Sequence, residues 1–375
     1  MMKSLFILKF KTALKMNLFL SLIVAVCSCA KPVEIKNDAP IEPKPPSYQL
    51  INPQIEEKKI TDERAGYLST LQNKVTHEDE IYVVYIKRGE QMERTLAVLD
   101  TNYHEILRQP FSNRVTGSGS RSQFVQGLDN QILYFDDVGI SDLTGNLIWV
   151  NRAFGSSKVT PIFENRDNFG ALVIGGKETG EGKAEYRSPK GELLREFGEV
   201  GINYRTGLHD ISVLTTENNE NYPMLLTQKG LDKPMVQIYD EQFNLVRKIP
   251  DVGFDTLSIN WPSNGHILYR EASTFYVLDI QGQEKFSIPI NNLSFSIAHM
   301  DLSEVLVINN KRYLAVAVSP NSSIDASALL IFDPKGKLIW QKEYRGIVAI
   351  TKNSKKHSFL IGGLDGLIEI KLNMS

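Results

Sequence analysis

The stretch Ile331-Phe332-Asp333-Pro334-Lys335-Gly336-Lys337-Leu338-Ile339-Trp340 decides the fold of this chain. Two apolar residues lead to an aspartate, turn residues and a glycine follow, and a polar residue then leads to an apolar run ending in an aromatic side chain. Aspartate can accept hydrogen bonds from backbone N–H groups two residues further on, and glycine takes the positive φ that a tight reversal requires. The stretch therefore predicts two strands joined in a hairpin.

The same pattern recurs along the chain. Clear copies run from Ile140 to Trp149 and from Val277 to Phe286, and weaker copies begin at Val98, Ser188 and Ile238. Successive turns lie 39 to 54 residues apart, and one four-stranded blade needs roughly 40 to 50 residues. The repeat therefore predicts an all-β fold, a β-propeller.

The blade count follows from the six copies and the end of the chain. Residues 357–372 indicate two strands joined at Leu364-Asp365-Gly366, after which the sequence stops. We predict about seven blades, with six or eight as alternatives. Because an open ring would leave strand edges unpaired, residues between about 47 and 80 are expected to supply the missing outer strand. Where Asn102–His104 and Gln242–Asn244 replace the glycine turn, we expect a longer or differently shaped connection.

The repeat resembles that of quinoprotein-like (PQQ-repeat-like) propellers, in which an aspartate, a Thr-Gly or equivalent and a tryptophan close each blade. The segments Asp142–Trp149 and Asp333–Trp340 carry the resemblance, and the other copies have lost the tryptophan. It covers most of residues 81–375 and implies a fold. It implies no activity, because propellers host enzymes, scaffolds and binding proteins alike.

The N-terminus predicts export. Four early lysines precede an apolar run from Leu18 to Val26, which has the charge order of a secretory signal. Val26-Cys27-Ser28-Cys29 resembles a bacterial lipobox, which implies that residues 1–28 are a lipoprotein signal peptide and that Cys29 carries the lipid, palmitate among its acyl chains. Cys27 is the weaker candidate because Val26 before it is large. An ordinary cleaved signal with two incidental cysteines is the alternative.

The segments after Cys29 predict a tether and a helix. Ala30 and Lys31 follow, with no aspartate at the second mature position, and by resemblance to the sorting rule of enteric bacteria this favours the outer membrane, facing the periplasm. Prolines recur through residues 29–60 and predict an extended tether. Thr61-Asp62-Glu63-Arg64 predicts a short helix, capped by Thr61 and reaching about Leu71, at the start of a propeller domain over residues 61–375.

The sequence contains one candidate catalytic residue, His209. The six histidines show no metal-ligand spacing, and the mature chain lacks the cysteine pair of quinone-dependent dehydrogenases, so we expect neither metal nor cofactor. His209-Asp210, with Arg205 nearby, faintly resembles the His-Asp before a blade strand in bacterial arylsulfotransferases. A structural histidine between blades is the alternative role for His209.

Charge excludes one class of partner. The net charge is −2 and the pI about 6.4, which gives no basic excess for nucleic acid. The lysine-rich run Lys352–His357 is expected to be a solvated loop of the last blade.

Two functional hypotheses follow. The first is a lipid-anchored, non-catalytic scaffold that presents its loops to envelope proteins and is monomeric outside any complex. It resembles in outline the propeller lipoproteins of the outer-membrane β-barrel assembly machinery. The second is an exported enzyme or ligand binder of arylsulfotransferase-like type that uses the central channel through His209, Asp210 and Arg205.

Overall fold

Strands account for all the regular structure in the described part of the chain. The computed structural model describes residues 52–73, 75–87, 93–111, 123–126, 131–136, 139–150, 156–164, 168–176, 182–197, 210–215, 221–227, 234–240, 242–252, 256–259, 266–271, 273–290, 293, 297–320 and 327–374. Within these ranges no helix is long and apolar enough to cross a membrane.

The described strands form seven antiparallel sheets of four strands each. The first sheet contains β2 (Ala65–Gln72), β3 (Asp79–Lys87), β4 (Glu93–Leu99) and β5 (Glu105–Pro110), and the second contains β6 (Gln123–Gln126), β7 (Ile132–Asp136), β8 (Gly139–Ser141) and β9 (Leu147–Val150). The third contains β10 (Ser156–Glu164), β11 (Asn168–Gly176), β12 (Gly182–Arg187) and β13 (Leu193–Phe197), and the fourth contains β14 (Asp210–Thr215), β15 (Asn221–Thr227), β16 (Met235–Tyr239) and β17 (Leu245–Ile249). The last three are β18 (Thr256–Ile259), β19 (His266–Glu271), β20 (Thr274–Leu278) and β21 (Glu284–Pro289); β22 (Ile297–Ile308), β23 (Lys311–Pro320), β24 (Ser327–Phe332) and β25 (Leu338–Tyr344); β26 (Ile347–Asn353), β27 (Ser358–Gly363), β28 (Gly366–Leu372) and β1 (Ile55–Thr61).

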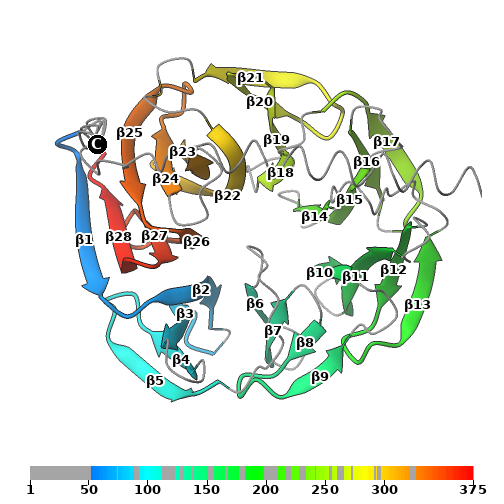
Figure 1. The fold of residues 1–375 in the computed structure, drawn as a ribbon, viewed down its shortest axis with the longest axis horizontal. Helices are drawn as coiled ribbons and strands as arrows, with labels where there is room; N and C mark the ends of the chain where they lie inside the picture. The colour runs from blue at the N-terminus through cyan, green and yellow to red at the C-terminus, as the bar shows by residue number, and fades with distance from the viewer. Residues whose placement is uncertain are drawn as a thin grey trace, which may run out of the picture. The chain divides into compact units, whose positions relative to one another are not determined.

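The sheets are the blades of a closed β-propeller, as predicted. The inner strand of each blade contacts an adjacent blade, and β26 of the seventh blade contacts β2 of the first. Figure 1 shows the blades in chain order around a ring, with the blue β1 beside the red β28. We number the blades 1 to 7 from β2 onward and call the seventh the closing blade.

One turn geometry joins the two outer strands of blades 1 to 6. The first turn residue accepts a hydrogen bond from the backbone N–H three residues on and donates its own N–H to the carbonyl four residues on, as Asp333 does with Gly336 (2.9 Å) and Lys337 (2.9 Å). Its Oδ1 also accepts from the N–H groups of Lys335 and Lys337. The fourth residue has positive φ, which is +77° at Gly336. This is a type I turn followed by a bulge residue.

The expectation of a different connection at the two glycine-free turns was wrong. Tyr103 (φ +72°) and Phe243 (φ +62°) take the glycine position in turns with the same backbone hydrogen bonds. Tertiary contacts outweigh the cost of the left-handed conformation, because the Phe243 ring packs 5.0 Å from that of Tyr186 in the preceding blade. Where glycine stands, the preceding blade fills the same space: a Cβ on Gly191 would lie 1.8 Å from Trp149.

The N-terminal strand closes the ring, as predicted. β1 pairs antiparallel with β28, from Ile55 opposite Leu372 to Thr61 opposite Leu367. In the closing blade the two outer strands, β28 and β1, are not consecutive in the chain, so no outer turn joins them. Asn52 starts a local turn before β1: its carbonyl accepts from the Ile55 N–H (2.9 Å) and its Oδ1 from the Gln54 N–H (3.0 Å).

Two boundaries drawn from the sequence were wrong. The predicted helix from Thr61 to Leu71 is absent, because Ala65–Gln72 form the inner strand β2 and pair with β3. The predicted tether to residue 60 extends too far, since residues 55–60 belong to β1. Residues 55–60 pair with β28, which is distant in the chain, and residues 65–72 pair with the neighbouring β3, so strand pairing decides the structure of both segments. The predicted signal peptide, residues 1–28, and residues 29–51 lie outside the described residues.

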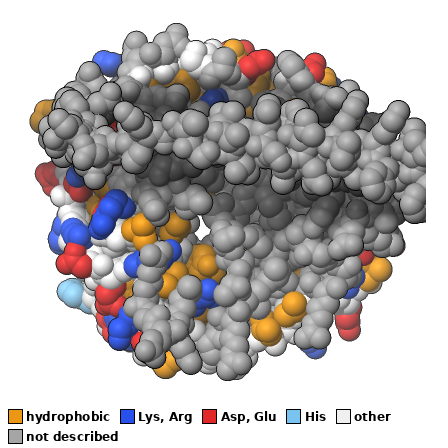
Figure 2. Space-filling model, in the orientation of Figure 1, with side chains coloured by type: hydrophobic (Ala, Val, Ile, Leu, Met, Phe, Trp, Pro, Cys, Tyr) orange, Lys and Arg blue, Asp and Glu red, His pale blue; other side chains and the backbone are white. Residues whose placement is uncertain are grey.

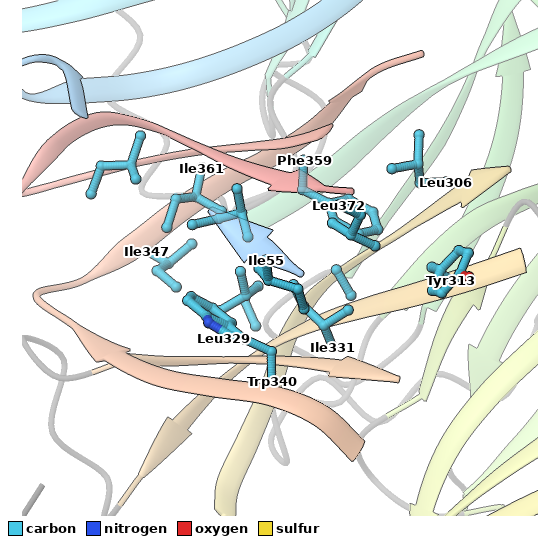
Figure 3. Packing of buried hydrophobic residues seen from close by; sticks show 14 of the residues in the cluster. Ile55, Leu306, Tyr313, Leu329, Ile331, Trp340, Ile347, Phe359, Ile361 and Leu372 are labelled. Carbon is cyan, nitrogen blue, oxygen red and sulfur yellow. The ribbon is translucent and has the colours of Figure 1, made fainter. Parts of the chain in front are cut away.

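Apolar clusters fill the spaces between blades. Figure 3 shows the cluster between blade 6 and the closing blade, in which Leu329 and Ile331 lie opposite Phe359 and Ile361, and Ile55 from β1 lies among them. Trp340 lies in the same cluster, and Trp149 packs against a core cluster of blade 2.

Candidate functional site

Of the predicted catalytic residues His209, Asp210 and Arg205, the structure describes only Asp210. Asp210 is the first residue of the inner strand β14, where it pairs with Leu226, so its place at a strand entry agrees with the sequence. His209, Arg205 and the proposed lipid-bearing Cys29 lie outside the described residues. A catalytic role for these residues therefore stays a prediction.

The described histidines are dispersed. In the part of the chain that the structure covers, no three His, Cys, Asp or Glu side chains gather in a way that could hold a metal ion. His104 lies in the turn of blade 1, with Nδ1 3.1 Å from the Asp100 Oδ2. His266 is buried, and desolvation lowers its pKa to about 4, so its imidazole is neutral at pH 7.

A buried polar cluster, unnoticed in the sequence, joins the closing blade to blade 1. The Tyr103 hydroxyl and the Ser358 hydroxyl (2.9 Å) both donate to Oε1 of Glu369, whose side chain is 5 % exposed. Burial, and then the hydrogen bond to this carboxylate, raise the pKa of Tyr103 far above its usual value. The phenol is therefore a permanent donor in the physiological range, which suits a structural lock between blades.

The lysine-rich run of the last blade is anchored by this cluster. The prediction of a solvated loop holds for the exposed Ser354, Lys355 and His357, but it was wrong for Lys352 and Asn353, which end strand β26. Asn353 is fully buried. Its Nδ2 donates to the Thr101 carbonyl (3.0 Å) in blade 1, and its Oδ1 accepts from the Lys356 N–H (3.2 Å). The Lys356 ammonium lies 4.0 Å from the centre of the Tyr103 ring. The expectation was wrong for Asn353 because the sequence does not show which blade lies beside the run.

A second feature is a series of exposed aliphatic pairs on the outer strands of blades 1 to 4. Each pair lies within the first three residues of its strand, and its side chains are between 37 % and 58 % exposed. The pairs are Ile106 and Leu107 on β5, Leu147 and Ile148 on β9, Leu193 and Leu194 on β13, and Leu245 and Val246 on β17. Hydrophobic side chains accordingly reach the outline of the ring in Figure 2.

The rest of the ring lacks this pattern. The equivalent residues are Glu284 and Lys285 on β21, the partly buried Leu338 and Ile339 on β25, and Ile55 and Glu56 on β1.

Outer strands β5, β9, β13 and β17 each end the strand order of their sheet, so one backbone edge has no partner strand among the described residues. We call the four aliphatic pairs and these edges the apolar rim. The sequence does show the pairs, directly after each turn, but only the fold shows that they are left uncovered.

Comparisons with known proteins assign the chain to no family. No family model and no curated protein matches the sequence. Among solved structures, the chain is similar to the Pan2 WD40 domain of Neurospora crassa, with a TM-score of 0.49 and 12% identity over 88% of this chain and 96% of that one. It is also similar to a protein of unknown function from Bacteroides caccae, with a TM-score of 0.40 and 13% identity over 69% and 92%. A eukaryotic initiation factor gives a TM-score of 0.38 and 11% identity over 81% and 79%. The chain is a β-propeller with distant structural neighbours, and these similarities assign it to no family.

Proposed function

We propose that this protein is a non-catalytic interaction scaffold, held at the outer membrane of a bacterial envelope by acylation of Cys29 and facing the periplasm. The apolar rim is the observation that carries the scaffold role. The lipobox-like Val26–Cys29 segment supports the anchor, and the presence of Ala30 instead of an aspartate directly after Cys29 supports the outer membrane. Two or more acyl chains hold a protein at a membrane persistently.

The rim suits a protein partner for a physical reason. Consecutive residues of a strand point to opposite faces of the sheet, so an exposed aliphatic pair means that both faces of the strand are uncovered at that point. An uncovered backbone edge flanked by apolar side chains is an aggregation hazard unless another chain covers it. An extended segment of a partner could add to such an edge by backbone hydrogen bonds, with the aliphatic side chains supplying apolar contact.

The rim offers several equivalent positions. Blades 1 to 4 follow one another around the ring, so four similar edges lie along one arc (Figure 1). A partner with several short extended segments could bind more than one of them, and linked weak contacts bind more tightly together than each does alone. We therefore expect a partner that spans neighbouring blades.

Crosslinking followed by co-purification from detergent-solubilised envelopes tests the scaffold role. The double variant Leu193→Ser/Leu194→Ser should lose the co-purifying envelope protein while keeping its thermal unfolding midpoint. The matched control Val75→Ser/Val307→Ser removes two exposed aliphatic side chains outside the rim and should retain the partner. Retention of the partner by both variants contradicts the proposal.

Two further variants separate the remaining parts of the proposal. Cys29→Ser should abolish incorporation of labelled palmitate and release the protein from the membrane fraction. His209→Ala should leave the co-purifying partner in place. Loss of a sulfotransfer or ligand-binding signal in His209→Ala would favour the enzyme hypothesis instead.

A further inference from the structure

The closing blade carries a basic hollow that neither the apolar rim nor the polar cluster explains. Its volume is about 440 Å³, and three chain segments line it: β1, β28 and the turn between β26 and β27. Lys58 comes from β1, Lys371 from β28, and Lys355, Lys356 and His357 from the turn. The hollow exists only because the N-terminal strand closes the ring beside the C-terminal one. Figure 2 shows Lys and Arg side chains gathered, with acidic ones among them, at the left edge of the ring where β1 and β28 lie.

The charges around the hollow do not cancel. Glu56 and Glu369 are the two acids in its lining. Glu369 is buried and already accepts hydrogen bonds from Tyr103 and Ser358. Lys355 lies 3.3 Å from Glu78 in an exposed ion pair, which contributes little net energy. Lys58 and Lys371 make no ion pair with any described residue. Four lysines therefore line the hollow with two carboxylates, one of which is engaged in the blade interior. The Lys356 ammonium lies over the Tyr103 ring.

The turn that carries three of the basic residues is held in place before any ligand arrives. Buried Asn353 fixes its start through the Thr101 carbonyl, and the His357 carbonyl accepts from the Leu372 N–H at 2.9 Å. His357 has φ of +54°, a left-handed conformation that costs a residue with a side chain free energy. A fixed turn avoids the backbone entropy loss that a flexible loop incurs on binding, so that only the lysine side chains have to be ordered.

We propose that this hollow is a binding site for a phosphate-bearing anion. Lysine ammonium groups are donor-only point charges, which suit the several acceptor oxygens and the double charge of a phosphate monoester or pyrophosphate. The volume lies within the range of roughly 300 to 1,000 Å³ that small-molecule pockets occupy, so it leaves room for a group larger than phosphate itself. A phosphorylated small molecule and a lipid headgroup share this chemistry. The site depends neither on acylation of Cys29 nor on the scaffold role.

Calorimetric titration of the full-length chain with pyrophosphate, at constant ionic strength, tests the proposal. The double variant Lys58→Gln/Lys371→Gln should bind pyrophosphate at least tenfold more weakly than the wild type. The control Lys335→Gln/Lys337→Gln loses the same charge from the exposed turn of blade 6 and should bind as the wild type does. Lys58→Arg/Lys371→Arg keeps the charge and should keep measurable binding, which separates loss of the site from misfolding.

A vesicle arm distinguishes the two sources of phosphate. Phosphatidylglycerol and phosphatidylcholine vesicles are sedimented with the same four proteins. Sedimentation with phosphatidylglycerol vesicles that fails only in Lys58→Gln/Lys371→Gln identifies a lipid headgroup and supports the site. Pyrophosphate binding with the same variant dependence, without vesicle binding, identifies a soluble ligand and also supports it. Equal losses in the two glutamine variants, or no binding of either probe by the wild type, would overturn the proposal.

Discussion

The Tyr103 hydroxyl in blade 1 donates a hydrogen bond to the buried Glu369 carboxylate of the closing blade, although the two residues are 266 positions apart in the chain. The ring is therefore closed twice: by the backbone pairing of β1 with β28, and by a polar lock between the closing blade and blade 1. The lock uses a tyrosine in a turn position that glycine occupies in four of the six turns. A residue that departs from the repeat thus has a structural role at the junction of the chain's two ends.

Removal of this hydroxyl should weaken the closure. In Tyr103→Phe, Glu369 keeps only the Ser358 donor, and hydrogen bonds to charged groups contribute about 1.5 to 3 kcal/mol. We expect urea unfolding to show a loss of about 2 kcal/mol in the free energy of unfolding. Tyr82→Phe is the control, because its hydroxyl bonds Glu80 within one strand (2.8 Å) and not across two blades. Equal losses in the two variants would show that the contact between blades adds nothing.

The turn glycines should differ in their tolerance of a methyl group. In Gly191→Ala the new Cβ meets the Trp149 ring at 1.8 Å, whereas in Gly282→Ala it meets Ile249 at 3.2 Å. Both variants incur the left-handed strain of about 1 to 2 kcal/mol. The overpacking at Trp149 should add about 1 to 3 kcal/mol in Gly191→Ala alone.

A double-mutant cycle checks the cause of this difference. Trp149→Ala removes the obstructing ring. In that background, Gly191→Ala should lower the free energy of unfolding by at least about 1 kcal/mol less than it does in the wild type. The free energies of unfolding of the four proteins give the coupling directly. Additive effects would mean that backbone strain, and not the packing of Trp149, makes Gly191 necessary.

Deletion of residues 52–62 should open the ring. The outer edge of β28 would then lack its partner strand, and the cluster around Ile55 would lose a buried side chain. We expect a lower thermal midpoint and self-association in sedimentation velocity, because unpaired edges pair with other chains. A synthetic peptide of residues 50–63 should restore the monomer, whereas the same peptide with Ile55→Asp should not. A deleted chain that stays monomeric with an unchanged midpoint contradicts the closure role.

His266 should make stability depend on pH between about 6.5 and 4. Burial lowers its folded pKa from 6.5 to about 4, so below pH 6.5 the unfolded chain binds a proton that the folded chain does not. The contribution of His266 to the free energy of unfolding is fully present above pH 6.5. It decreases as the pH falls toward 4, by an amount on the order of 2 kcal/mol.

Comparison with His266→Gln isolates this contribution. Urea midpoints of the two proteins at intervals from pH 7 to 4.5 should converge as the pH falls. Asp142 and Asp279 have pKa values below the usual 3.8, because turn hydrogen bonds, with the Lys285 ammonium at Asp279, outweigh the effect of burial. Their contributions are lost only as the pH falls below about 4, so they do not confuse the measurement. Parallel pH profiles for the two proteins would refute the assignment to His266.

The repeated turn was predictable because its geometry is local. An aspartate that accepts N–H groups two and four residues on, as Asp333 does, carries its reason within five residues of sequence. The spacing of these turns predicted the propeller, and the missing outer strand of the last blade predicted its closure. The helix predicted at Thr61–Leu71 was wrong because its acidic, capped start is a local preference, and pairing of Ala65–Gln72 with β3 outweighs it.

The sequence by itself therefore determined the repeating unit, the number of blades to within one, and the need for an N-terminal strand. Tertiary structure alone decided which side chains meet across blades: Tyr103 with Glu369, Asn353 with Thr101, and the lysines of β1, β28 and the turn between β26 and β27 around one hollow. The physical reason is range. Turn hydrogen bonds and strand alternation act over a few residues, whereas contacts between blades depend on side chains that the closed ring brings together from opposite ends of the chain.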